Sequence, residues 1–314
     1  MREPNFFLVG APKAGTTSLY HYLRQHPDIY MSPIKEPSYF SSEIRPENCD
    51  PDYRSHMEVL VERTRELLRD PMNIPIADGL VTTWQDYQQL FYAADGQRAV
   101  GEASVGYMTS QAAAAGIAAR FPRAKILMVL RSPVERAFSQ YQHIATSGLI
   151  TENFREYVRA CLRHGDGGIG PYKPFLEMSF YAAQLERYFD HFPRAQIGIW
   201  IYEETRLQPE DFLRQIFRFL SVDDSFTPDI RKRYNEPRLP RLLSAGGALR
   251  WAGKLQPRRF VPAPLRGFAK RVIYRPPGSL QMDSADRELL LEFYRADILK
   301  LQGILNRDLS GWLV

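Results

Sequence analysis

Continuous apolar runs, each followed by a helical pattern, recur along this chain. The runs cover residues 6–9, 125–130 and 197–202, and residues 98–107 (RAVGEASVGY) predict a further short strand that ends at residues 102–104. Apolar runs without polar alternation are typical of parallel strands buried on both faces. Helical spacing follows them from about residues 16, 133 and 209. This alternation predicts an α/β fold of three layers, with a parallel central sheet and helices on both faces.

Further helices are predicted between and after these units. Residues 57–68 and 83–92 have helical spacing, the second with Thr82 or Thr83 as its N-cap. They form a helical insertion at about 43–98. A long amphipathic helix is expected over 284–306, capped by Ser284. We expect one domain over residues 1–314.

Composition narrows the class of protein only slightly. A content of 44% hydrophobic and 25% charged residues is ordinary for a soluble globular protein. No segment approaches the roughly 18 apolar residues of a membrane span, so a cytoplasmic protein is expected. Two cysteines and six histidines show no spacing typical of a disulfide framework or a metal site.

The net charge of +5 is concentrated in one segment. Residues 228–277 contain 13 Lys/Arg and 2 Asp/Glu. Within it, residues 265–273 form a basic amphipathic pattern, and residues 241–275 are a candidate contact with an anionic membrane or a lipid-linked acceptor. A helix packed on the core with solvated basic residues is the favoured alternative. Nucleic-acid binding is not expected, because no recognition module accompanies the charge.

The candidate chemistry begins where the first apolar run ends. Residues 10–18 read GAPKAGTTS and lead into a helix. Gly10 and Gly15 allow the backbone to approach a ligand closely, and the first amides of the helix favour an anion. The pattern is close to the Walker A form GxxxxGK[ST], but Thr16 stands where its lysine belongs. The lysine is Lys13, inside the loop.

This loop resembles the 5′-phosphosulfate loop of sulfotransferases that use 3′-phosphoadenosine 5′-phosphosulfate (PAPS), in the branch containing heparan-sulfate sulfotransferases and many bacterial enzymes. The resemblance implies a P-loop NTPase-like fold, PAPS as the sulfuryl donor and no metal. It also implies donor contacts from the loop and first helical turn: Lys13, Ala14, Gly15, Thr16, Thr17 and Ser18.

Two further motifs resemble the same family. Residues 126–143 (ILMVLRSPVERAFSQYQH) match its 3′-phosphate motif, in which Arg131 and Ser139 bind that phosphate. Residues 35–40 (KEPSYF) match the segment whose glutamate, here Glu36, is the catalytic base. His143 matches a histidine close to the reacting centre, so the choice of main base between Glu36 and His143 stays open. The family's lid motif is absent, and Arg238 is the candidate in its place.

One departure concerns the acceptor. Relatives in the heparan-sulfate group have a lysine after the glutamate equivalent to Glu102, and here that residue is Ala103. The predicted reaction is transfer of a sulfuryl group from PAPS to a hydroxyl, with an amine less favoured, of a carbohydrate, lipid-linked or small-molecule acceptor. The alternatives are a P-loop kinase or NTPase, which needs a lysine at position 16, and a non-catalytic peripheral membrane-binding protein.

Overall fold

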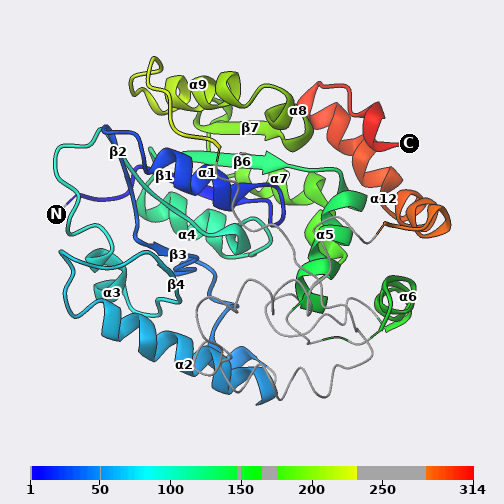
Figure 1. The fold of residues 1–314 in the computed structure, drawn as a ribbon, viewed down its shortest axis with the longest axis horizontal. Coiled ribbons are helices and arrows are strands. Elements are labelled where there is room, and N and C mark those ends of the chain that lie inside the picture. The colour runs from blue at the N-terminus through cyan, green and yellow to red at the C-terminus, as the bar shows by residue number, and fades with distance from the viewer. Residues whose placement is uncertain (1, 50, 147–149, 151, 165–174, 232–280) are drawn as a thin grey trace, which may run out of the picture. The chain divides into compact units, whose positions relative to one another are not determined.

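The structure is a computed structural model that describes residues 2–49, 51–146, 150, 152–164, 175–231 and 281–314 (Figure 1). Its contacts divide the chain into two compact units. The first unit holds the described residues of 1–132 and 180–234, and the second holds those of 133–179 and 235–314.

A five-stranded parallel sheet forms the centre of the first unit. Its strand order is β2-β5-β1-β6-β7. Strand β1 pairs with β5 and β6, so that Leu8 lies opposite Ala103 on one side and Leu127 on the other. All five residues of β1 are buried, as a strand covered on both faces requires. The strands are β1 Phe6–Gly10, β2 Ile29–Met31, β5 Ala99–Ala103, β6 Lys125–Leu130 and β7 Ile197–Ile201.

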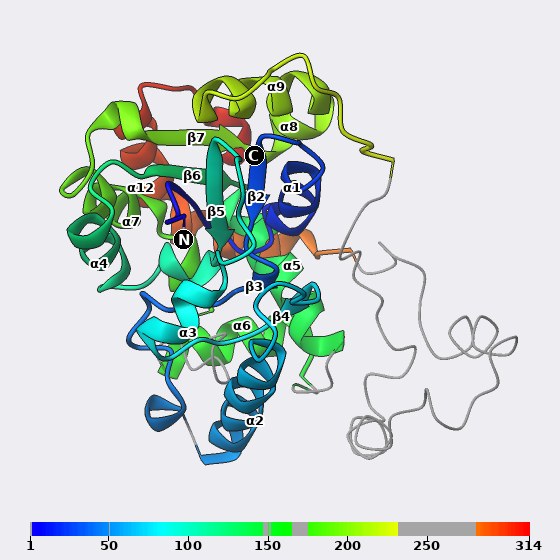
Figure 2. The same cartoon turned by 90° about the vertical axis from the view of Figure 1, so that its left-hand side faces the viewer.

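Helices cover both faces of this sheet. Figure 2 shows α1 (Thr16–Leu23) on one side and α4 (Ala113–Arg120) with α7 (Tyr181–Phe189) on the other. Helix α9 (Pro209–Leu220) packs with the α1 layer, because the ring of His26, just after α1, packs edge-on against Phe217 with 4.7 Å between the ring centroids. The short helix α8 (Tyr202–Leu207) follows β7 directly. The predicted α/β class, with a parallel sheet between helices, is confirmed.

Residues 43–98, the predicted insertion, contain α2 (Pro51–Leu67), α3 (Trp84–Gln89) and the short strand β4 (Ala77–Asp78). Strand β4 pairs in parallel with β3 (Ile34–Lys35), which precedes the insertion. The hydroxyl of Thr83 accepts a hydrogen bond from Asp86 N at 3.1 Å, so Thr83 is the N-cap of α3.

The second unit contains α5 (Pro133–Thr146), α6 (Phe154–His164) and α12 (Ser284–Leu305). Tyr294 of α12 donates a hydrogen bond to Leu176 O at 3.0 Å. The expected cap of α12 was wrong by one residue: Asp283, not Ser284, accepts from Ala285 N at 2.8 Å. Both residue types are good N-caps, and the aspartate precedes the first helical residue. In the part of the chain that the structure describes, no helix is long and apolar enough to cross a membrane.

Candidate functional site

The loop between β1 and α1 curls through two residues with left-handed backbone. Lys13 has φ 67° and Gly15 has φ 80°. A Cβ on Gly15 would lie 2.8 Å from the ring of Tyr202, so only glycine fits there without displacing that ring. Ala11 N donates to Val129 O of β6 at 2.7 Å, which fixes the start of the loop to the neighbouring strand. The loop therefore has a shape set by the sheet below it.

Arg131 follows β6 and contacts this loop. Its Nη1 donates to Lys13 O at 3.0 Å, and its guanidinium carbon lies 5.0 Å from the ring centroid of Tyr202. Strands β1 and β6 are neighbours, and the carboxyl ends of parallel strands meet at one edge of a sheet. Two cationic residues thus lie side by side at this edge, which suits a ligand with several phosphate charges.

Glu36 lies in a segment that the backbone holds in an unusual conformation. Glu36 has φ 59° and Ser38 has φ 52°, both in the left-handed region. Glu36 N donates to Ala103 O at 2.9 Å, and its Oε2 accepts from Val105 N at 2.8 Å. Its Oε1 forms an ion pair with Lys35. These contacts attach the predicted base to the carboxyl end of β5.

A buried carboxylate, that of Glu102, comes directly before Ala103, whose carbonyl accepts the hydrogen bond from Glu36 N. Glu102, in β5, is fully buried and accepts hydrogen bonds from the hydroxyls of Tyr87 at 3.0 Å, Tyr107 at 2.7 Å and Ser104 at 2.6 Å. Burial raises the pKa of Glu102 to about 7, although these three donors lower it. Burial also raises the pKa of Tyr87 and Tyr107 well above their usual value, so both stay protonated donors.

Ser139 and His143 lie on α5, which belongs to the second unit. Ser139 is half-buried and His143 is exposed. Their roles at the 3′-phosphate and the reacting centre stay predictions. Arg238 and the segment 241–275 lie outside the described residues.

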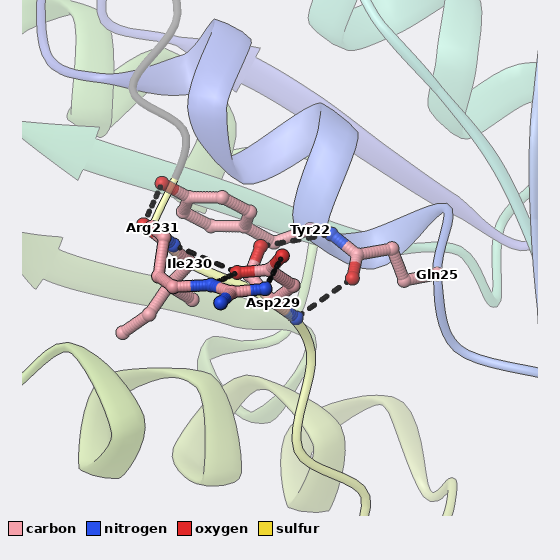
Figure 3. Close-up of polar contacts among 5 residues, drawn as sticks. All are labelled: Tyr22, Gln25, Asp229, Ile230 and Arg231. Carbon is pink, nitrogen blue, oxygen red and sulfur yellow. Dashed lines mark hydrogen bonds and ion pairs between the residues drawn. The ribbon is translucent and has the colours of Figure 1, made fainter.

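The chain leading towards Arg238 is fastened to the end of α1 (Figure 3). Gln25 and Asp229 exchange two hydrogen bonds: Asp229 N donates to Gln25 Oε1 at 2.7 Å, and Gln25 Nε2 donates to Asp229 O at 3.2 Å. Tyr22 donates to Ile230 O at 3.3 Å, and Arg231 forms an ion pair with Asp229 at 2.8 Å. These bonds hold residues 229–231, at the start of the basic segment, against the end of α1.

Sequence reasoning assigned no role to three residues near these groups: Glu102, Tyr202 and Glu203. Tyr202 contacts both Gly15 and Arg131, and Glu203 Oε1 accepts from Ser132 N at 3.0 Å. A signal was present, because a Tyr-Glu pair directly after the buried strand β7 lies at the edge where ligands bind.

With this geometry in view, comparison with known proteins identifies the class. Residues 4–227 match the family model described as "Sulfotransferase family". The chain therefore belongs to the sulfotransferase family, as its motifs predicted.

Among curated relatives, rat carbohydrate sulfotransferase 15 is 28% identical over 263 residues, covering 70% of this chain and 44% of the relative. Human bifunctional heparan sulfate N-deacetylase/N-sulfotransferase 3 is 27% identical over 324 residues, covering 99% of this chain and 31% of the relative. The chain thus spans less than half the length of these relatives. A crystal structure of a sulfotransferase from Alicyclobacillus acidocaldarius superposes with a TM-score of 0.73 at 30% identity, covering 99% of each chain.

Proposed function

We propose that this chain transfers a sulfuryl group from PAPS to an acceptor hydroxyl. The observation that carries the proposal is the contact between Arg131 and the loop carrying Lys13, at the ends of adjacent strands β6 and β1. This pair fits a nucleotide with separate 5′ and 3′ phosphate groups. Membership of the sulfotransferase family supports the same donor.

The residues would divide the work as follows. Lys13 and the first amides of α1 would hold the 5′-phosphosulfate, with backbone or hydroxyl contacts from Ala14, Gly15, Thr16, Thr17 and Ser18. Arg131 and Ser139 would hold the 3′-phosphate, and Arg238 would close over it. PAPS, when bound, supplies an activated sulfuryl group.

Glu36 would act as the general base. As the acceptor oxygen attacks, its proton passes to the Glu36 carboxylate while the new O–S bond forms. The S–O bond to the 5′-phosphate breaks, and its electrons stay on the phosphate oxygen, next to Lys13. The products are the sulfated acceptor and 3′-phosphoadenosine 5′-phosphate (PAP). His143 is the alternative base.

We propose that the acceptor is a carbohydrate. Lipid-linked and small-molecule alcohols are the alternatives, and an amine is less favoured than a hydroxyl. Support comes from the relatives named for carbohydrate and heparan sulfate sulfation. Position 103, at the end of β5, is a fully buried alanine. It therefore cannot provide the contact with an anionic acceptor that a lysine at that position would provide. We therefore expect an acceptor of lower negative charge than a highly sulfated glycan.

Three variants test the assigned roles with two measurements. PAP affinity is measured by calorimetric titration. Turnover is measured as PAP release from PAPS with a panel of sugar, lipid-linked and amino alcohols as acceptors. Lys13→Ala and Arg131→Ala should each weaken PAP affinity by about 10- to 100-fold, because each removes a charge-assisted contact. Glu36→Gln should lower turnover by about 10²- to 10⁴-fold with little change in PAP affinity. Arg123→Ala, at an exposed position just before β6, is the charge control.

The outcomes separate the alternatives. Binding of ATP·Mg²⁺ with no response to PAP or PAPS would point to a kinase or NTPase. Binding to anionic vesicles without PAP binding or PAP release would point to a peripheral membrane protein. An unimpaired Glu36→Gln enzyme would transfer the base role to His143.

A further inference from the structure

The hydroxyls that surround Glu102 have a second set of partners. Ser104 Oγ accepts a hydrogen bond from Ser38 N at 3.0 Å, and Tyr107 Oη accepts from Phe40 N at 3.3 Å. Both amides belong to the segment that carries Glu36. Each hydroxyl therefore donates to Glu102 and accepts from this segment, and it links the two.

The direction of these bonds depends on the carboxylate. A hydroxyl has one proton, and donating it to Glu102 turns the oxygen lone pairs towards the backbone N–H groups. Both oxygens of Glu102 are used: Oε1 accepts from Tyr87 and Tyr107, and Oε2 from Ser104. A proton on Oε2 would displace the Ser104 hydroxyl proton. The ionised form of Glu102 thus matches all of these bonds.

The segment so held is strained. Glu36 and Ser38 have φ 59° and 52°, conformations that residues other than glycine keep only where their surroundings impose them. Three groups hold this segment, and all come from residues 104–107, just after Glu102. Ser104 Oγ accepts from Ser38 N, and Tyr107 Oη accepts from Phe40 N. Val105 N donates to Glu36 Oε2. The geometry of the proposed base is therefore set from β5.

We propose that Glu102 is a positioning residue for Glu36, acting through Ser104 and Tyr107. This inference rests on the proposed role of Glu36 as the base. Loss of the Glu102 network displaces the Glu36 carboxylate from the acceptor proton without changing the phosphate contacts. Turnover falls while donor affinity is kept, because a misplacement of about 1 Å can cost on the order of 100-fold in rate.

A matched pair of variants separates positioning from general stability. Tyr107→Phe removes the hydroxyl between Glu102 and Phe40 N. Tyr188→Phe removes another fully buried hydroxyl, which donates to the backbone carbonyl of Tyr107 at 3.0 Å and forms no hydrogen bond with the Glu36 segment among the described residues. We expect Tyr107→Phe to lower PAP release from PAPS by about 10- to 100-fold and Tyr188→Phe to leave it unchanged. PAP affinity should stay within about twofold in both.

Two further readouts distinguish positioning from a structural role. Hydrogen exchange at the Ser38 and Phe40 amides should accelerate in Tyr107→Phe and not in Tyr188→Phe. The wild-type rate should fall as pH drops below about 7, as the Glu102 carboxyl gains a proton. In Glu102→Gln, which cannot ionise, the rate should be low and lack this inflection. The titratable groups facing Glu102 are Tyr87 of α3, Tyr107, Tyr188 of α7 and Glu36.

Equal PAP release by Tyr107→Phe and Tyr188→Phe overturns the inference, and so does unchanged exchange at Ser38 and Phe40. These results need only the two tyrosine variants, so they test the inference even if Glu102→Gln does not fold. A wild-type chain that neither binds PAP nor releases it from PAPS overturns the proposed function instead. The exchange measurement then still tests whether Glu102 positions the segment.

Discussion

At the scale of single residues, the burial of Glu102 has opposite effects on function and stability. The proposed positioning role needs the ionised carboxylate, whereas burial disfavours that form. The pKa of Glu102 is raised to about 7 from an ordinary value of 4.5, with burial as the main cause. Between these two pH values the folded chain binds more protons than the unfolded chain. The free energy of unfolding therefore falls as pH rises through this window, and the ionised carboxylate above it is kept at a cost in stability.

This cost can be measured. In urea unfolding at pH 5 and pH 8, the wild type should lose on the order of 2 to 3 kcal/mol of stability relative to Glu102→Gln, since other groups titrate alike in both proteins. Parallel stability curves from pH 5 to 8 would show that Glu102 does not titrate in this window.

At the scale of elements, the strands and helices differ in how far sequence could predict them. Strands β1 and β6 and the start of helix α9 were predicted almost to the residue, because unbroken apolar runs and a Pro at the first helical position are strong local signals. Strands β2, β3 and β4 have two or three residues each, too few for a period to appear. Their pairing depends on partners that are distant in sequence.

The residues of the candidate site also differ in how far the sequence could predict their positions. Lys13 and Arg131 could be predicted to lie together, because both follow core strands and strand ends gather at one edge of a parallel sheet. Glu102 could not, because its partners Tyr87 and Tyr107 come from different elements with no common spacing. Burial of a carboxylate is a property of the packed structure rather than of a motif.

Two glycines make a test of element packing. Gly303 lies within α12, and no atom of the residues that the structure describes lies within 4 Å of an added Cβ, so Gly303→Ala should raise the free energy of unfolding by about 0.5–1 kcal/mol. Gly101 lies in β5, where a Cβ would sit 2.6 Å from the backbone oxygen of Phe6. Because backbone cannot move aside cheaply, Gly101→Ala should lower stability by about 1–3 kcal/mol. Thermal unfolding of both variants checks the signs; a destabilised Gly303→Ala would contradict the first.

At the scale of the whole molecule, donor binding should be visible as stabilisation. PAP at 100 times its dissociation constant should stabilise the chain by about 2.7 kcal/mol and raise the Tm by several degrees. ADP, which lacks the 3′-phosphate, is the control and should give a much smaller shift at the same concentration. Equal shifts with PAP and ADP would mean that Arg131 does not contact a 3′-phosphate.

The position of β1 in the sheet also has a consequence for synthesis. Phe6 pairs with Gly101 on one side and Lys125 on the other, so both neighbours of β1 lie about a hundred residues further along the chain. At roughly 5–20 residues per second, β1 leaves the ribosome several seconds before either partner strand exists. Its apolar residues stay unpaired over that interval, and contacts so distant in sequence form slowly. We expect the nascent chain to depend on chaperones until β6 has emerged.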